Sequence, residues 1–337
     1  MKMYLPKKIV VDKNSPINFN SISEALNFIK TIREKKEISK NELIEIFIKE
    51  GIYKEKIEII LDNVLLTGED VDKTIITESF GAKDVLDDGS KRGTFRTATV
   101  RTLGKDITLK NLTIKNEAGS GVNAGQAVAF YADGNIIVEN CKFLAHQDTI
   151  FTAPLPPTNI DGTTTGMGPR GDFKRTPTKV YFKNCFIEGD IDFIFGGAAA
   201  LFENCKIFSH EIALEDDSKI HGYITAASTP EKQKFGYLFL NCTLESNCPE
   251  NTVYLGRPWR DNAKTVFANC SFGKHIRSEL WHDWNKPNAQ RKSFYAVGNC
   301  YFENKKINQV KWSHILNNTE TEKYIQLFLK FFHDFQV

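Results

Sequence analysis

Short segments in which apolar and polar residues alternate around an asparagine recur along the whole chain. Six have a cysteine directly after the asparagine, as in VENCKF and FLNCTL, and two, LDNVLL and LKNLTI, keep the pattern without it. Their alternation and their β-branched and aromatic residues predict short strands. The eight asparagines are Asn63, Asn111, Asn140, Asn184, Asn204, Asn241, Asn269 and Asn299. Successive ones are 20 to 48 residues apart, close to one or two units of roughly 20–30 residues, a solenoid period.

The asparagine has a physical reason to recur once per coil. Asparagine tolerates the left-handed backbone region, so it can bend a strand at the same point of every coil, and stacked asparagines could hydrogen-bond from coil to coil. The next residue would point inward, where a small side chain such as cysteine packs well. The pattern therefore predicts an all-β protein, a right-handed parallel β-helix whose coils bury their apolar faces on one another.

Helical patterns are found at the two ends of the repeat. Ser21 to Glu24 form a capping box that opens an amphipathic run, which predicts a helix covering the open N-terminal end. The stretch from Glu320 to Phe335 is also helical in spacing and rich in aromatic residues, and we expect it to pack back along the outside of the coils. The expected organisation is a single domain over 1–337, with an N-terminal cap at about 15–40, coils at about 41–312 and a C-terminal helical tail at about 313–337.

Residues 152–178 interrupt the repeat. They contain five prolines and four glycines in 27 residues, which predicts a long loop rather than a coil.

Composition narrows the class of protein. The chain has 337 residues, 44 Lys and Arg against 42 Asp and Glu, a net charge of +2 and 41% apolar residues, as expected of a globular protein. A balance so close to neutral argues against a nucleic-acid partner. No apolar run reaches 18 residues, so no membrane span is predicted. The N-terminus lacks the apolar stretch of a signal peptide, which favours the cytoplasm for the sequence as it stands, or secretion if a signal has been removed.

The seven cysteines raise three possibilities: metal binding, disulfides and packing. No C-x-x-C pair occurs, which disfavours zinc and redox sites. Cysteines of the same phase on adjacent strands could pair, since strands lie about 4.8 Å apart. A ladder of six thiols at one phase is more typical of packing, and Cys248 is expected to be a loop thiol outside it.

Two aspartates share a phase of the repeat. Asp148 lies eight residues after Asn140, and Asp192 lies eight residues after Asn184. If the loop is set aside, one coil separates them, which predicts carboxylates on the order of 5 Å apart on one face. Two carboxylates so close cannot both ionise easily, so one pKa should rise while the other stays low, giving an acid and an anionic nucleophile or base. The alternative is that each aspartate only ends a strand at a turn.

The residues around these aspartates favour chemistry. The segments QDTIF from Gln147 and DFIFG from Asp192 surround a carboxylate with aromatic side chains that exclude water and could stack on a sugar. Further along, the segment LGRPW places Arg257 and Trp259 between turn residues. An arginine can hold a carboxylate by two parallel hydrogen bonds, although such a segment alone is often structural.

These motifs resemble the pectin methylesterase (pectinesterase) family, in its bacterial type. GIYKE from Gly51, GQAVA from Gly125, QDTIF, DFIFG and LGRPW stand in the family's order over residues 51–259, and the repeat extends the match to about residue 312. The resemblance implies a parallel β-helix and a carboxylic ester hydrolase that removes methyl esters from galacturonate units of pectin or oligogalacturonides.

The resemblance also implies catalytic roles. Asp192 would be the nucleophile, and Asp148 the general acid that protonates methanol and then the base that activates water. Gln147 and Gln126 would donate to the tetrahedral oxyanion. Arg257 would pair with Asp192 and keep it ionised.

Substrate contacts follow from the same motifs. Trp259, Phe151, Phe195 and Tyr223 would bind the sugar, with Tyr223 equally readable as an ordinary strand residue. The expected partner is methylated pectin or an oligogalacturonide, with no nucleic acid, no membrane, no cofactor and no metal, and the protein is expected to be a monomer. The loop 152–178 would wall one side of the cleft and favour short oligomers.

Other readings of the same residues stay open. A pectate lyase or a polygalacturonase is also a β-helix with clustered carboxylates, and a carbohydrate-binding solenoid could keep the fold without activity. A serine–histidine mechanism is disfavoured, because His146 precedes the motif but has no evident serine or cysteine partner.

Overall fold

The computed structural model describes residues 7–158, 162, 176–213, 219–303 and 307–332. Within these residues the strands form three parallel sheets. The seven-stranded sheet consists of β4 (Ile57–Ile59), β7 (Val100–Thr102), β10 (Phe130–Ala132), β13 (Ile150–Thr152), β16 (Ile191–Gly196), β19 (Gly222–Ala227) and β22 (Val253–Gly256). The nine-stranded sheet consists of β3 (Gly51–Lys54), β6 (Thr74–Glu78), β9 (Thr113–Asn116), β12 (Lys142–Leu144), β15 (Phe186–Gly189), β18 (Lys206–Ser209), β21 (Thr243–Ser246), β24 (Ser271–Phe272) and β26 (Tyr301–Phe302). The eleven-stranded sheet consists of β1 (Lys8–Val11), β2 (Ile44–Ile48), β5 (Val64–Gly68), β8 (Ile107–Lys110), β11 (Ile136–Glu139), β14 (Lys179–Lys183), β17 (Ala199–Glu203), β20 (Tyr237–Leu240), β23 (Lys264–Ala268), β25 (Phe294–Gly298) and β27 (His314–Leu316).

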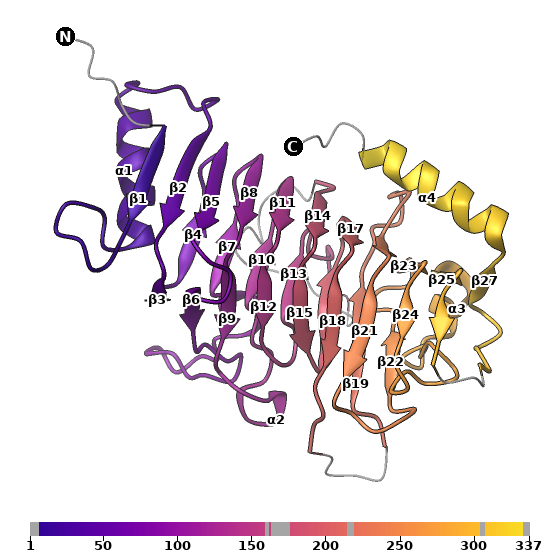
Figure 1. The fold of residues 1–337 in the computed structure, drawn as a ribbon. Helices are drawn as coiled ribbons and strands as arrows, with labels where there is room; N and C mark the ends of the chain where they lie inside the picture. The colour runs from indigo at the N-terminus through magenta and orange to yellow at the C-terminus, as the bar shows by residue number, and fades with distance from the viewer. Residues whose placement is uncertain (1–6, 159–161, 163–175, 214–218, 304–306, 333–337) are drawn as a thin grey trace.

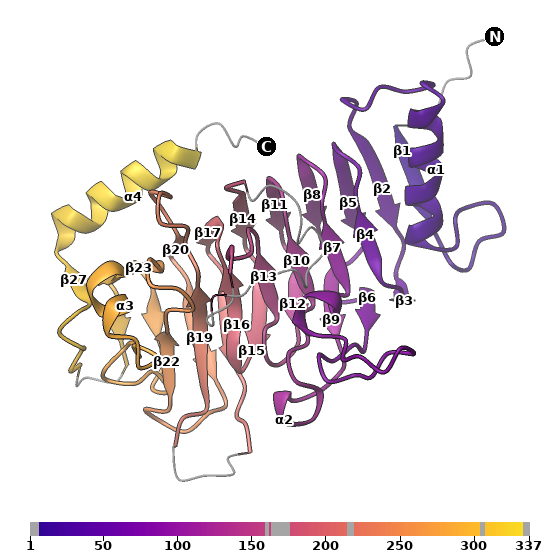
Figure 2. The ribbon, with the colours of Figure 1, turned by 180° about the vertical axis from the view of Figure 1, so that it is seen from behind.

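Each complete coil visits the three sheets in the same order. The chain passes from the eleven-stranded to the nine-stranded and then to the seven-stranded sheet, and each strand pairs with its equivalent in the next coil. Figure 1 shows the coils stacked side by side from the indigo N-terminal end to the yellow C-terminal end, and Figure 2 shows the same stack from behind. The predicted right-handed parallel β-helix is confirmed.

The recurring asparagine marks one corner of every coil. It lies between a strand of the eleven-stranded sheet and the next strand of the nine-stranded sheet, as Asn140 does between β11 and β12. All eight asparagines have φ between 52° and 55°, the left-handed conformation expected from the sequence. Hydrogen bonding along the ladder is sparser than expected: among the described residues, one amide-to-amide bond is found, from Asn140 Nδ2 to Asn111 Oδ1 at 3.4 Å.

The cysteines after these asparagines are packing residues, as predicted. All seven thiols are free, and five of the six in the ladder are buried. Inside the coils they lie beside a stack of phenylalanine rings, in which Phe202, Phe239 and Phe267 follow one another at centroid distances of 4.4 and 4.3 Å. Identical positions in successive coils therefore bury identical side chains, which holds neighbouring coils in register.

The N-terminal cap is a helix with one unpredicted strand before it. Helix α1 (Ile22–Glu34) begins at the predicted cap, where Ser21 accepts a hydrogen bond from the Glu24 N–H, and it packs on β1, β2 and β4. Strand β1 lies ahead of the cap and extends the eleven-stranded sheet by pairing with β2. The expectation that coils begin only near residue 41 was therefore too narrow.

The C-terminal tail is only partly helical. Residues 314–316 form β27, which pairs with β25 and forms the last strand of the eleven-stranded sheet. Helix α4 (Asn318–Phe332) then runs back over the outer face of that sheet, where Phe328 is buried on Leu238 and Val266. Packing along the outside of the coils, as predicted, covers an apolar surface that would otherwise face water.

Long connections surround the outer face of the seven-stranded sheet. One set enters this sheet from the nine-stranded sheet and includes residues 79–99, with helix η1 (Thr94–Arg96), and residues 117–129, with helix α2 (Gly121–Ala124). The other set leaves this sheet for the eleven-stranded sheet. In the final turns, helix α3 (Pro287–Lys292) lies between β24 and β25. Most of the predicted loop 152–178 lies outside the described residues, so its expected role as a wall of the cleft stays a prediction. No helix within the described residues is long and apolar enough to cross a membrane.

Candidate active site

The two same-phase aspartates lie on adjacent coils. Asp148 stands two residues before Ile150 of β13, and Asp192 two residues before Ile194 of β16, and these isoleucines are directly paired. The Asp148 N–H donates to the Ile191 carbonyl at 3.1 Å, which joins the two turns. Both aspartates have left-handed backbones, with φ of 66° and 52°. The structure thus brings the predicted pair together at the corner where the chain enters the seven-stranded sheet.

Arg257 orients the carboxylate of Asp192. Its Nε and Nη2 atoms each donate to a different oxygen of the carboxylate at 2.8 Å, the bidentate geometry proposed from the sequence. The guanidinium is itself held between two aromatic rings, since its centre lies 3.8 Å from the ring centroids of both Tyr223 and Trp284. Tyr223 is therefore placed in the site, but its observed contact is with the arginine.

Burial gives the two carboxyls unusual proton affinities. Burial raises the pKa of Asp148 well above its usual range, and the negative charge of Asp192 adds to this effect. Burial also raises the pKa of Asp192, although Arg257 opposes the rise by its charge and its hydrogen bonds. The expectation that Asp148 carries the raised pKa is confirmed. The expectation that the pKa of Asp192 stays low is wrong, because burial of this residue, which is 6% exposed, raises the pKa by more than Arg257 lowers it.

The two predicted glutamines lie on neighbouring coils beside the carboxyls. The Ala127 N–H donates to the Gln147 carbonyl at 3.0 Å, which sets Gln126 next to the coil that carries Gln147. Both side chains are half-buried. Gly121 in helix α2 leaves room for the Gln147 side chain, since a Cβ atom at residue 121 would lie 2.3 Å from the Gln147 Oε1 atom.

An aromatic cluster adjoins the aspartates on the outer face of the sheet. Phe151, Phe195 and Trp259 belong to it, as their motifs suggested, but Phe95 was not predicted. The Phe95 ring lies 5.1 Å from that of Phe151, 6.3 Å from that of Phe195 and 6.4 Å from that of Trp259. Phe151 is fully buried and Phe195 is 4% exposed, so the expectation that these two rings line the sugar groove is corrected to a supporting role.

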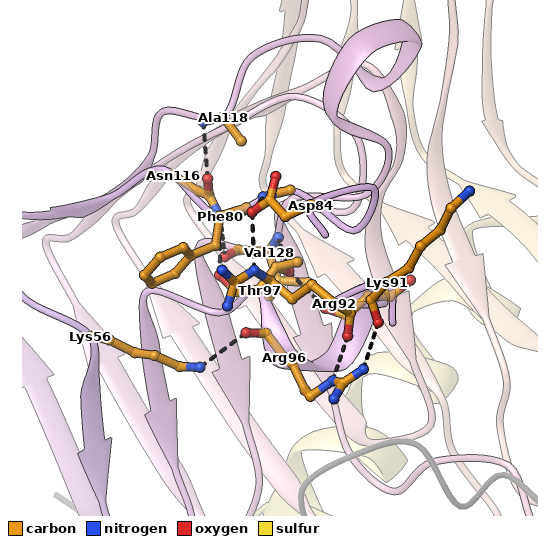
Figure 3. Close-up of polar contacts among 12 residues, drawn as sticks. Lys56, Phe80, Asp84, Lys91, Arg92, Arg96, Thr97, Asn116, Ala118 and Val128 are labelled. Atoms are coloured by element: carbon orange, nitrogen blue, oxygen red, sulfur yellow. Dashed lines mark hydrogen bonds and ion pairs between the residues drawn. The ribbon is translucent and has the colours of Figure 1, made fainter. Parts of the chain in front are cut away.

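The segment that carries Phe95 is tied down by one buried amide. Asn116 Nδ2 lies 3.1 Å from the carbonyls of Phe80 and Thr97 and 2.9 Å from that of Val128, while its Oδ1 accepts from the Ala118 N–H. Figure 3 shows Asn116 at the centre of these contacts. One side chain thus joins both ends of the 79–99 connection to Val128 in the 117–129 connection, two residues before β10.

Cationic side chains hold the rest of that connection. In Figure 3, Arg92 pairs with Asp84 through a 3.0 Å contact, and Lys56 donates to the Arg96 carbonyl at 3.0 Å. The Arg92 guanidinium also lies 4.2 Å from the centroid of the Phe80 ring. These contacts fix the backbone on either side of Phe95, so its ring is held in place over the cluster.

Replacing Asn116 by alanine should destabilise the fold. The substitution leaves the buried carbonyls of Phe80 and Thr97 without their amide donor, so we expect a loss of about 2–3 kcal/mol in the free energy of unfolding. Urea unfolding followed by tryptophan fluorescence measures it. The control is Asn288→Ala on exposed α3, for which we expect a change below about 0.5 kcal/mol. Equal stability of Asn116→Ala and the control would contradict the assigned tether.

Two further residues near Arg257 were missed by the sequence analysis. Lys286 donates to the carbonyls of Pro258 and Trp259 at 2.8 and 3.1 Å, and burial lowers its pKa to about 8. Trp284, which covers Arg257, stands two residues earlier. Neither belongs to a repeated motif. The only local signal was the aromatic-rich WHDWNK segment that begins at Trp281.

A cavity opens beside Trp259. It has a volume of about 690 Å³, and five of its fifteen lining residues are prolines. Its charged lining residues are Arg260, Lys286, Glu231 and Asp261. No three His, Cys, Asp or Glu side chains gather into a metal-binding group within the described part of the chain. The described side chains at the site supply carboxyl, amide, guanidinium, ammonium and aromatic groups.

Sequence comparison places the chain among pectinesterases. The sequence model of the Pectinesterase family matches residues 8–155 and 175–331. "Probable pectinesterase 8" of Arabidopsis thaliana is 31% identical over 300 residues, which cover 87% of this chain and 66% of that protein. "Probable pectinesterase/pectinesterase inhibitor 64" of Arabidopsis thaliana is 32% identical over 264 residues, which cover 74% of this chain and 39% of that protein. The chain thus spans less than two thirds of the length of either relative.

Comparison of structures agrees with the sequence match. A crystal structure of a pectin methylesterase in complex with hexasaccharide VII superposes with a TM-score of 0.75 at 26% identity. The superposition covers 95% of this chain and 96% of that one, so the whole β-helix is shared. With a family match that extends over both sides of the 152–178 loop, the chain belongs to the pectinesterase family.

Proposed function

We propose that this protein is a pectin methylesterase that hydrolyses the methyl esters of galacturonate units and releases methanol. The observation that carries the proposal is the bidentate Arg257–Asp192 pair directly beside the buried carboxyl of Asp148. One carboxyl is oriented by a cation, and its neighbour has a strongly raised pKa, which is the division needed for a nucleophile and a general acid. Membership of the pectinesterase family supports the same reaction.

In the first half of the reaction, Asp192 attacks the ester carbonyl. One carboxylate oxygen bonds to the carbonyl carbon, and the carbonyl electrons move to its oxygen, where the amides of Gln126 and Gln147 donate hydrogen bonds. The intermediate collapses with loss of the methoxy group. Asp148 gives this group its proton, so methanol leaves and an acyl–Asp192 anhydride remains.

In the second half, Asp148 has the opposite role. Its carboxylate takes a proton from water as the water oxygen attacks the galacturonyl carbon, and the bond to Asp192 breaks. The product is a free galacturonate, and both aspartates return to their starting forms. Arg257 keeps Asp192 oriented, and the rings of Tyr223 and Trp284 on its guanidinium restrict the positions that the arginine can take.

The substrate is proposed to be pectin-type, since the aromatic cluster and the carboxyl pair share one face of the sheet. Trp259 and Phe95 present partly exposed rings next to the carboxyls, and such rings stack on the apolar faces of sugars. The protein is proposed to act as a monomer on methylated pectin or oligogalacturonides.

A product analysis on methylated pectin tests this function. We expect methanol release that is matched by new carboxylates, with no new reducing ends and no unsaturated products. New reducing ends would indicate a polygalacturonase, and unsaturated products a pectate lyase. Binding without any product would indicate a carbohydrate-binding solenoid, and each of these results would contradict the proposal.

A further inference from the structure

A histidine–aspartate pair lies directly behind the two catalytic carboxyls. His146 stands two residues before Asp148, and Asp190 two residues before Asp192. The His146 Nδ1 and Asp190 Oδ2 atoms are 3.0 Å apart. Since an ionised carboxylate only accepts, Nδ1 is the donor in this contact. The proposed reaction uses neither residue.

The side chains of His146 and Asp190 join the two turns that carry Asp148 and Asp192, which backbone hydrogen bonds also join. The Asp190 N–H donates to the His146 carbonyl at 3.2 Å, and the Asp148 N–H donates to the Ile191 carbonyl at 3.1 Å. The second Asp190 oxygen accepts from the Ile191 N–H at 2.6 Å. The side-chain contact therefore closes a small network whose other members fix the backbone of Asp148 and Asp192.

The surroundings of His146 contain two further titratable groups. Glu188 lies on β15, and His210 follows β18 with its ring centroid 5.6 Å from that of His146. The His210 Nε2 atom is 3.4 Å from Glu188 Oε2. The hydrogen bond that His146 donates to Asp190 raises the pKa of His146 above its ordinary value against the effect of partial burial, and the charges of Asp190 and Glu188 add to the rise.

Asp190 lies in a more enclosed place than its partner. It is 2% exposed, whereas the His146 side chain is 38% exposed. The titratable groups that sense its charge are His146, the Cys248 thiol, and the two catalytic aspartates. For Asp148 and Asp192, burial raises the pKa first and the negative charge of Asp190 adds to that rise. In its protonated form, the histidine is thus a cation that offsets a third buried carboxylate of the site.

We propose that His146 and Asp190 form a positioning pair that holds the two catalytic turns together and sets the pH range in which the carboxyls can work. The inference rests on the proposed esterase function for its kinetic consequences. The positive charge of protonated His146 balances the negative charge of Asp190, so the pair produces only a small net electrostatic potential at Asp148 and Asp192. When His146 loses its proton, the charge of Asp190 is left unbalanced beside them.

The two single variants should move the pH–rate profile in opposite directions. Asp190→Asn removes a negative charge, so both catalytic carboxyls titrate at lower pH, and both limbs of the pH–rate profile move to lower pH. His146→Gln removes the balancing positive charge, so both limbs move to higher pH. A shift on the order of half a pH unit is expected for each. The double variant carries a neutral amide pair and should have limbs near those of the natural protein.

The measurement is kcat/KM for methanol release between pH 4 and 9, for the natural protein, the three variants and His210→Gln. His210 contacts Glu188 and not Asp190, so it is the matched control, and its limbs should stay within about a tenth of a pH unit, far below the shift that one unit charge produces. Opposite shifts in the single variants support the pair. A fall in rate with unmoved limbs, shifts in the same direction, or an equal shift in His210→Gln would overturn the proposal.

An activity-independent titration separates this inference from the proposed function. The NMR signal of the His146 ring, assigned by its loss in His146→Gln, should titrate above the ordinary histidine range and return toward that range in Asp190→Asn. If this shift is seen but no methanol is released, the pair stands and the esterase proposal fails. If methanol is released but the His146 titration is the same in both proteins, the esterase stands and the pair is refuted.

Discussion

Asp192→Asn is expected to lower the kcat for methanol release by about 10⁴-fold or more, because an amide cannot replace a carboxylate as the nucleophile. The variant keeps the shape of the side chain, and its oxygen can still accept one hydrogen bond from Arg257, so the fold should persist. Initial rates on methylated pectin, with methanol measured directly, give the result. Residual kcat within tenfold of the natural protein would refute the assignment of Asp192 as nucleophile.

The matched control for this variant is Asp106→Asn. Asp106 also has a left-handed backbone, with φ of 55°, but it lies exposed in the turn between β7 and β8, on a different corner of the coil. We expect the natural rate from it. Circular dichroism and thermal unfolding of both variants show whether lost activity reflects chemistry or unfolding, since only a folded and inactive Asp192→Asn protein supports the assignment.

Asp148→Asn is expected to lower kcat by about 10²- to 10⁴-fold, because methanol is a poor leaving group that needs a proton as it departs. The size of the loss should depend on the leaving group. An activated aryl ester of galacturonate departs without protonation, so the variant should form its acyl-enzyme at a rate closer to that of the natural protein. An equal loss on methyl and aryl esters would argue against Asp148 as the general acid.

The same variant should also be at least as stable as the natural protein at pH 7. Burial raises the pKa of Asp148, so the folded state holds a proton that the unfolded chain releases. The corresponding stability is present below the unfolded pKa of the group and is lost as pH rises through the folded pKa. Asparagine does not titrate, so the advantage of Asp148→Asn in thermal unfolding should shrink when the pH is lowered to about 4, near the ordinary aspartate pKa.

The fold was predictable because its signal is local and repeated. Each coil uses the same left-handed asparagine at the same corner, as at Asn140 and Asn184, so the conformational preference of one residue type indicates where every coil turns. The phase of the repeat then places Asp148 beside Asp192 before any contact is known. The strand β1 and the short strand β27 lack the asparagine motif, which is why they were not predicted.

Contacts among the connections follow no period. Trp284 and Tyr223 enclose Arg257 from segments about 60 residues apart along the chain. Phe95 reaches the aromatic cluster from a connection whose shape depends on the buried amide of Asn116, and it covers Phe151. A sequence motif names the residue types available for a site, but it does not say which of them are buried under others.

By itself, the sequence determined the β-helix, its ladder of cysteines and the adjacency of the two aspartates, since these follow from residue preferences repeated at a fixed phase. The capping helix followed from its own capping box, and the structure decided that the thiols are free. Only the tertiary structure decided how the carboxyls behave. The raised pKa of Asp192 and the position of Asp190 behind it depend on the burial and charges contributed by several coils at once. Electrostatic energy is a sum over neighbours in space, and that sum is defined only when the coils have stacked.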